Sequence, residues 1–184
     1  IAQVSIDLKP YRIGKKDVVI GIAASGTTPY VREALRIAHQ QGAYTVLLSC
    51  NPLDQNDTVI QTYLILPVGP EVVSGSTRLK AGTATKLILN RITTISMIQI
   101  GKVYDNLMVD LNISNQKLVK RSVRIVSQLT GLSQDKAKYL IEQANGEVKT
   151  AIVMYHQQCD YSKAKMLLET CGGHLRKALS QLNK

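Results

Sequence analysis

The chain has 184 residues, 45% of them hydrophobic and 20% charged, which is typical of one medium soluble domain, with or without a small appendage. No apolar run approaches the roughly 20 residues that cross a bilayer, and the first residues lack the pattern of a secretory signal. Cys50, Cys159 and Cys171 are too few and too scattered for a disulfide framework or a zinc site, so we expect a protein of the reducing cytoplasm.

The formal net charge is +10, and most of the excess lies near the end of the chain. Residues 1–115 carry 11 Lys and Arg against 8 Asp and Glu, whereas residues 116–184 carry 12 against 5. The chain has no Trp or Phe, and its basic side chains are not interleaved with aromatic rings on which bases could stack. We therefore expect a solvated basic face rather than a nucleic-acid partner.

Three continuous apolar, β-branched runs, at residues 18–24, 45–50 and 63–68, predict strands buried on both faces of a parallel sheet. Between the first two runs, apolar residues recur at helical spacing over residues 29–41. Pro29 suits the first turn of that helix, and Gly42 suits the position just past its end. The pattern predicts a βαβ unit with a right-handed crossover and an α/β fold.

The turn after the first strand is rich in small and hydroxyl-bearing residues, and it opens the helix. Its backbone N–H groups, with the hydroxyls of Ser25 and Thr28, suit the binding of a phosphate at the start of the helix. Gly26 would let the backbone approach the phosphate closely. The alternative is an ordinary turn in which Ser25 or Thr28 only caps the helix. The local pattern leaves these two interpretations equally open.

A second turn of this kind follows the third strand. Ser76 and Thr77 offer hydroxyl donors, Arg78 offers a guanidinium fork, and Lys80 adds a charge. Glu71 is the one carboxylate placed here for proton chemistry, although a lone Glu near a helix start more often caps the helix or complements its dipole. Both turns are expected at the carboxyl ends of strands, where open α/β sheets bind ligands.

A long helix is predicted over residues 80–104, and because it is apolar nearly all round we expect it to be buried on several sides. A sheet of three strands covered by such helices leaves a buried-type strand as an open edge. The first residue is Ile rather than Met. We therefore expect that the chain either lacks an upstream part or borrows strands from a partner.

The last third contains an internal repeat with an offset of 27 residues, in which residues 133–152 align without gaps to residues 160–179. Each copy has a capping residue, a short helix, a glycine stop and a second helix. Short helix pairs bury little alone, so we expect both copies to pack with a helix at residues 117–129. The sequence thus predicts a sheet domain over residues 1–115 and a small all-α domain, structural in role, over residues 116–184.

Several of these segments, in this order and spacing, resemble the bacterial N-acetylmuramic acid 6-phosphate etherases, a family of sugar-phosphate lyases with a sugar isomerase (SIS) domain. The segments are GIAASGTTPYV at 21–31, SCNP at 49–52, VGPE at 68–71, GSTRLKAGTA at 75–84 and GKVYDNLMVD at 101–110. The helical repeat is similar to the tail of that family, so the resemblance covers essentially the whole chain. The related glucokinase regulatory proteins share much of the pattern.

The resemblance implies a three-layer SIS-type domain, incomplete here, in a homodimeric enzyme of peptidoglycan recycling that needs no cofactor. Such an enzyme cleaves the lactyl ether of N-acetylmuramic acid 6-phosphate, giving N-acetylglucosamine 6-phosphate and D-lactate. The expected course is elimination followed by addition of water, with two glutamates transferring protons. By resemblance, Ser25, Gly26 and Thr28 hold the sugar phosphate, and residues 71–80 lie nearby.

Two departures from the family accompany the resemblance. The family usually has Arg where this chain has Thr27, which removes one positive charge from the predicted site. The resemblance places both catalytic glutamates upstream of Ile1, so no catalytic residue is assigned in this chain. Glu71 is a weak remaining candidate. We expect the chain alone to be inactive. The alternative is a sugar-phosphate-sensing module that acts on a protein partner through the basic tail. The residues predicted to bind the sugar 6-phosphate are Ser25, Gly26, Thr27, Thr28, Glu71, Ser76, Thr77, Arg78 and Lys80.

Overall fold

The computed structural model describes residues 2–181, and the chain divides into two compact units, Ile1–Arg91 and Ile92–Lys184. The domain boundary that the sequence suggests, between residues 115 and 116, stays a prediction. Within residues 2–181, no helix combines the length and the hydropathy that a membrane-spanning segment requires.

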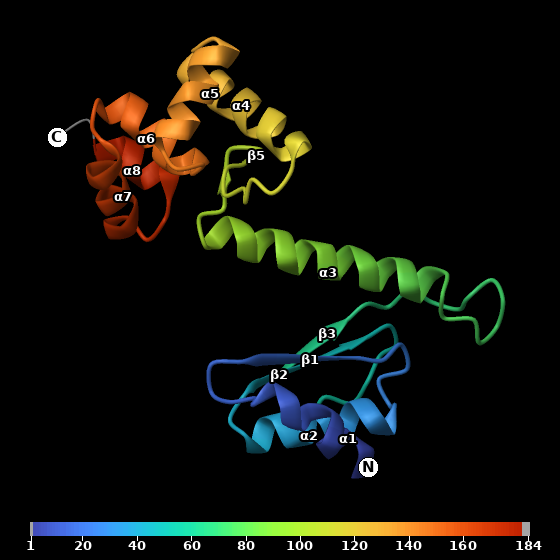
Figure 1. Ribbon diagram of the computed structural model, residues 1–184. Coiled ribbons are helices and arrows are strands. Elements are labelled where there is room, and N and C mark those ends of the chain that lie inside the picture. The colour runs from blue at the N-terminus through green and yellow to red at the C-terminus, as the bar shows by residue number, and fades with distance from the viewer. Residues whose placement is uncertain (1, 182–184) are drawn as a thin grey trace. The chain divides into compact units, whose positions relative to one another are not determined.

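The first unit is a mixed α/β structure built on a small parallel sheet (Figure 1). The strands stand in the order β1-β2-β3, and β2 pairs in parallel with both neighbours. Helix α2 lies against one face of the sheet, and α1 packs on α2 (Figure 1). The βαβ unit and the three strands that the sequence predicts are therefore present. The elements are α1 Ala2–Leu8, the 3-10 turn η1 Lys9–Tyr11, β1 Val18–Ile22, α2 Pro29–Gln40, β2 Tyr44–Ser49, β3 Thr62–Ile65 and the start of α3 Lys80–Gln99.

Strand β2 is the buried centre of this unit, and every residue in it except Tyr44 is buried. Fully buried Leu47 of β2 shares a hydrophobic cluster with Leu35 of α2 and Ile60 of the following turn. Burying a leucine side chain contributes about 1.5–3 kcal/mol. This packing fixes α2 on the sheet, and with it the turn that leads from β1 into α2.

Helix α3 is shorter than predicted. It ends at Gln99 rather than near Tyr104, because Gly101 takes a left-handed φ of 74° and the chain turns back. Lys102 N donates to Met97 O at 3.0 Å and Gly101 N to Ile98 O at 3.1 Å, which is the hydrogen-bond pattern of a Schellman stop. Val103 and Tyr104 then form β4, which pairs antiparallel with β5. The prediction failed because these two apolar residues continue the helical pattern in the sequence.

The expectation that the long helix is buried on several sides is also wrong for the chain as described. Ala81 is its buried residue, whereas Leu87, Ile95 and Ile98 are 54%, 53% and 48% exposed. The hydrophobic pattern of a helix records that its faces suit burial, but it does not say what covers them.

The second unit is helical, apart from the ribbon of β4 and β5 (Figure 1). Helices α5 and α6 form one copy of the predicted repeat, and α7 and α8 form the other. Ser133 and Asp160 cap α5 and α7, accepting from the backbone N–H groups of Lys136 and Lys163 at 3.5 and 2.8 Å. One hydrophobic core joins both copies to α4. The elements are β4 Val103–Tyr104, β5 Leu107–Met108, α4 Gln116–Thr130, α5 Gln134–Gln143, α6 Val148–Gln157, α7 Tyr161–Thr170 and α8 Leu175–Ser180.

Candidate functional site

The turn between β1 and α2 is built around Gly26. Gly26 N donates to Ala23 O at 2.9 Å, and Gly26 takes a φ of 73°, in the left-handed region that favours glycine. A Cβ at this position would collide with the side chain of Leu53, so the turn requires Gly26. The side chains of Ser25, Thr27 and Thr28 are exposed. Thus the loop is tightly formed on its inner side and presents hydroxyl groups to solvent.

The start of α2 has no side-chain cap. Thr28 occupies the N-cap position, but its hydroxyl does not bond to the N–H groups of the first turn. Ser25 Oγ lies 3.0 Å from Thr27 Oγ1 and accepts from Thr27 N at 3.3 Å, so it does not cap the helix either. The capping alternative is therefore wrong for both side chains. The uncapped N–H groups and the positive end of the helix dipole suit an oxyanion.

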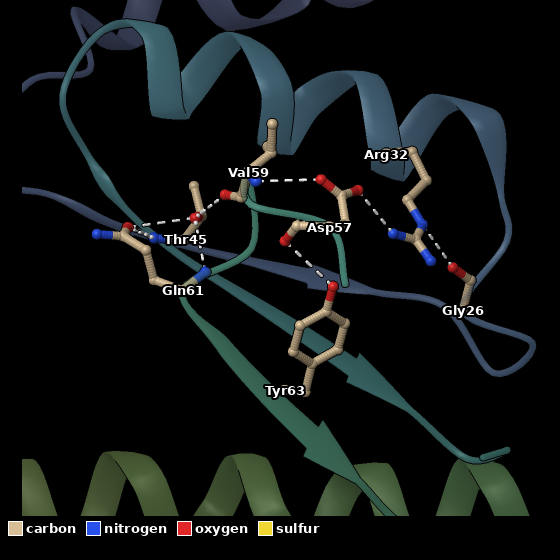
Figure 2. A network of polar contacts seen from close by, with 7 residues as sticks. All are labelled: Gly26, Arg32, Thr45, Asp57, Val59, Gln61 and Tyr63. Carbon is tan, nitrogen blue, oxygen red and sulfur yellow. Dashed lines mark hydrogen bonds and ion pairs between the residues drawn. The ribbon is translucent and has the colours of Figure 1, made fainter. Parts of the chain in front are cut away.

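Arg32, one turn into α2, holds this loop from its inner side (Figure 2). Its Nε donates to Gly26 O at 2.8 Å, and its Nη1 lies 3.0 Å from Asp57 Oδ2. Asp57 also accepts from Val59 N at 3.0 Å, and its carbonyl accepts from the Tyr63 hydroxyl at 3.3 Å. Arg32 thus ties the turn before α2 to the turn before β3.

The same network continues into the sheet through Thr45, which is completely buried in β2 (Figure 2). The Thr45 hydroxyl donates to the carbonyl of Val59, and Thr45 N donates to Gln61 Oε1 at 2.9 Å. These bonds satisfy the polar atoms that β2 buries and give the Asp57 turn one fixed shape. That turn in turn holds Arg32 in place.

The end of β2 supports the loop from its other side. The carbonyl of Ala24 accepts from Cys50 N at 3.0 Å, from Ser49 Oγ at 3.2 Å and from Asn51 Nδ2 at 3.2 Å. Cys50 is buried, with its thiol 3.6 Å from Ala81 O. The segment SCNP therefore acts as a structural turn that braces the loop.

The second predicted turn holds the start of α3. Glu71 Oε2 accepts from Lys80 N at 2.9 Å, and Glu71 Oε1 accepts from Ala81 N at 3.0 Å. The bond from Ala81 N, together with the one from Lys80 N, keeps the pKa of the Glu71 carboxyl below its ordinary value. Lys80 Nζ donates to the carbonyls of Pro70 at 2.8 Å and Val68 at 3.4 Å. Glu71 and Lys80 are thus engaged in shaping the turn, and the capping interpretation of Glu71 is confirmed.

Ser76, Thr77 and Arg78 of that turn are less engaged in contacts than Glu71 and Lys80. Ser76 is half-buried, whereas Thr77 and Arg78 are exposed. Within residues 2–181, Arg78 has no ion pair or hydrogen bond. The two turns share the carboxyl edge of the sheet but follow β1 and β3, which flank β2. Two strand spacings, roughly 10 Å, therefore separate the strands that carry them.

A separate polar cleft of about 680 Å³ lies in the second unit, where loops of both repeat copies meet. Asp110 pairs with Lys102 at 3.1 Å and with Lys149 at 3.2 Å. Burial alone would raise the pKa of Asp110, but the hydrogen bonds and charges of both lysines outweigh it and lower the pKa. Glu147 accepts from Lys165 at 2.6 Å. These lysines and carboxylates pair with one another, and the Glu147–Lys165 pair joins the two repeat copies, which indicates a structural role. No group of three or more His, Cys, Asp or Glu suited to a metal occurs in the described part of the chain.

Comparison with known proteins shows what the chain is similar to. Residues 105–145 match the family model of the C-terminal lid domain of glucokinase regulatory protein. An N-acetylmuramic acid 6-phosphate etherase of Geobacillus thermodenitrificans is 52% identical over 94% of this chain and 59% of its own length. Etherases of Rhodopirellula baltica and Bacillus subtilis are 48% and 47% identical, over 95% and 94% of this chain and 58% and 57% of their own lengths.

Over the part that it spans, the chain is about half identical to proteins named N-acetylmuramic acid 6-phosphate etherase. The resemblance that the sequence motifs suggest is therefore confirmed. The chain spans a little over half the length of these etherases.

Two residues that hold the loop, Arg32 and Asp57, were not predicted from the sequence. Arg32 and Asp57 lie 25 positions apart, in segments that read as a helix surface and a connecting turn. The sequence holds only an indirect indication of the role of Arg32. With Thr27 in the loop, the loop contains no basic residue, and Arg32, in the first turn of α2, is the next basic residue along the chain. Only the fold shows that its guanidinium returns to Gly26.

Proposed function

We propose that this chain is the sugar-phosphate-binding portion, with its helical tail, of a carbon–oxygen lyase of peptidoglycan recycling. The reaction is cleavage of the lactyl ether of N-acetylmuramic acid 6-phosphate to N-acetylglucosamine 6-phosphate and D-lactate. The observation that carries this proposal is the uncapped start of α2 beside Ser25, Thr27 and Thr28, in a chain about half identical to named etherases.

In this proposal the phosphate of the substrate sits at the start of α2. The free N–H groups of the first turn and the hydroxyls of Ser25 and Thr28 donate to its oxygens. Arg32 does not contact the phosphate, because its Nε and Nη1 are engaged with Gly26 and Asp57. Its role is to hold the Gly26 peptide so that the loop is formed before the ligand arrives, which lowers the entropic cost of binding.

Proton transfer in this proposal does not fall to Glu71. A general acid or base works best with a pKa near the working pH, whereas two backbone N–H groups lower the pKa of Glu71. Glu71 is also the one carboxylate in the described turns that follow β1 and β3. The carboxylates that the reaction needs must therefore come from elsewhere, and we expect the chain alone to bind substrate without turning it over.

We also propose that the chain works as a homodimer and that the three-layer arrangement is completed outside this unit. Val18 and Ile22 alternate with residues that face α2, and they are 60% and 42% exposed on β1. The exposed apolar side chains of α3 also form a surface that we expect another part of the assembly to bury. Sedimentation of the chain, alone and with the part of the Geobacillus thermodenitrificans etherase that it does not match, tests the proposal. Finding only one copy of the chain per particle in both samples would contradict it.

Release of D-lactate tests the proposed reaction. The chain is co-expressed with the part of the Geobacillus thermodenitrificans etherase that it does not match, and N-acetylmuramic acid 6-phosphate is added. We expect D-lactate from the pair and none from either piece alone, with the pair carrying Ser25→Ala slower at low substrate concentration. A soluble, associated pair that binds the substrate and releases no D-lactate would refute the proposed function.

A further inference from the structure

Helix α4 carries a stripe of positive charge that no carboxylate in the described residues balances. Lys117, Lys120, Arg121 and Arg124 stand at positions i, i+3, i+4 and i+7, so they share one face, and all four are exposed. The helix contains no acidic residue. In the described part of the chain, none of the four forms an ion pair.

This arrangement is unfavourable in the isolated chain. Like charges three and four positions apart on a helix repel each other, and Lys117 and Lys120 lie in the first turns, where the helix dipole is already positive. Elsewhere in the same unit cations have carboxylate partners, as Lys149 has Asp110, Lys165 has Glu147 and Arg176 has Asp105. An anionic partner would remove the repulsion along α4.

The charged stripe borders a groove between α4 and α5 with a volume of about 1110 Å³. Lys138 adds a fifth cation to its lining, against the single carboxylate of Asp135. Leu118 and Val119, both half-buried, and buried Val123 give the groove an apolar lining. An adjoining recess is lined by Val119, Val123 and Ile141, with Glu142 and Lys138 at its border. The surface therefore combines a cationic rim with an apolar floor.

We propose that this α4–α5 groove is a docking site for an acidic amphipathic helix of a partner protein. Carboxylates at positions i, i+4 and i+7 of such a helix match the spacing of the cations on α4, and an apolar residue between them reaches the floor. Nucleic acid fits the surface less well. No aromatic side chain lines the groove to stack on bases, and the apolar residues of the floor cannot donate hydrogen bonds to phosphates. The groove lies wholly in the second unit, so the proposal is independent of the phosphate loop.

The test uses the whole chain and a fluorescently labelled helical peptide with Glu at i, i+4 and i+7 and Leu between them, followed by anisotropy. One double variant, Lys120→Gln with Arg124→Gln, neutralises the rim. The matched control, Lys163→Gln with Lys177→Gln, removes two exposed charges from α7 and α8, so both variants have the same net charge. Circular dichroism checks that each variant is folded.

At about 0.15 M salt we expect saturable binding, a Kd raised about tenfold in the rim variant, and a change of less than about twofold in the control. A peptide with Gln in place of Glu, or with Ala in place of Leu, should also bind more weakly. Equal weakening by the two double variants would overturn the proposal, because it would mean attraction to net charge alone. So would the absence of saturable binding, or tighter binding of an oligothymidylate than of the peptide.

Discussion

Gly26 sets the shape of the loop that we assign to the phosphate, through its left-handed φ and through its contact with Leu53. Gly75 has a similar φ of 80° but open space around it. Comparing alanine variants at Gly26 and Gly75 therefore separates the free-energy cost of a left-handed backbone from the cost of a steric collision. Each change to alanine meets the first cost, about 1–2 kcal/mol, and only Gly26→Ala meets the second.

We expect Gly26→Ala to lower the free energy of unfolding more than Gly75→Ala does and to abolish binding of N-acetylmuramic acid 6-phosphate. Gly75→Ala should leave the phosphate loop intact and retain measurable affinity. Urea unfolding and calorimetric titration give the two quantities. Equal loss of affinity in both variants would show that the loop is not the site.

Arg32 is expected to act on affinity through the loop rather than by touching the ligand. Arg32→Met removes the bond to Gly26 and the ion pair with Asp57, so we expect the Kd for the sugar phosphate to rise about fivefold to tenfold. Arg36→Met on the same helix removes a surface pair with Glu33 and should leave the Kd unchanged. Asp57→Asn should weaken binding less than Arg32→Met, because Gly26 keeps its partner. An unchanged Kd in Arg32→Met would rule out the positioning role.

Ser122 on α4 carries a buried hydroxyl for which the described residues provide no hydrogen-bond partner. Replacing it with alanine removes an unsatisfied polar group from the core, so Ser122→Ala should raise the free energy of unfolding by up to about 1 kcal/mol. On the same helix, Ser127 Oγ donates to Leu132 O at 2.6 Å, and Ser127→Ala should lower it by about 1 kcal/mol. Thermal melts of both variants test the contrast, and a destabilised Ser122→Ala would contradict it.

At the scale of elements, Glu71 bonds to the start of α3, so we expect the stability of this helix start to depend on pH. Backbone N–H groups lower the folded pKa of Glu71, so its contribution to stability is present above the unfolded pKa and is lost as the pH falls through the folded pKa. We expect Glu71→Gln to melt at a lower temperature than the parent at pH 7, with the difference shrinking below about pH 4. Asp54→Asn, at an exposed carboxylate, is the control and should melt like the parent. A difference that stays constant down to about pH 3 would mean that Glu71 is not acting as a charged cap.

Elements with a strong local signal could be predicted from the sequence, and those decided by distant contacts could not. Continuous β-branched runs gave the three strands, and capping residues such as Ser133 and Asp160 gave the helices of the repeat. The ribbon after Gly101 was missed because two-residue strands carry almost no pattern of their own. The uncapped start of α2 was left undecided, since a threonine before a proline reads the same whether or not its hydroxyl bonds to the helix.

At the scale of the whole molecule, one unit holds the loop that we assign to the phosphate, and the other holds a charged helical repeat. The loop could be predicted in part: Ser25, Gly26 and Thr28 follow from the motif, whereas Arg32 and Asp57 follow only from the fold. Neither the sequence motif nor the fold assigns a carboxylate to proton transfer, because Glu71 caps the start of α3. Binding and turnover should therefore separate in this chain.

Calorimetric titration of N-acetylmuramic acid 6-phosphate into the chain tests the central claim most directly. Ser25→Ala removes a hydroxyl of the loop, and Ser162→Ala, on the exposed side of α7, is the matched control. We predict saturable binding, weakened about tenfold by Ser25→Ala and unchanged by Ser162→Ala, as expected for the loss of one hydrogen bond to a charged group. Heat no greater than that of dilution, or equal affinity in all three proteins, would contradict the assignment of the phosphate site to this loop.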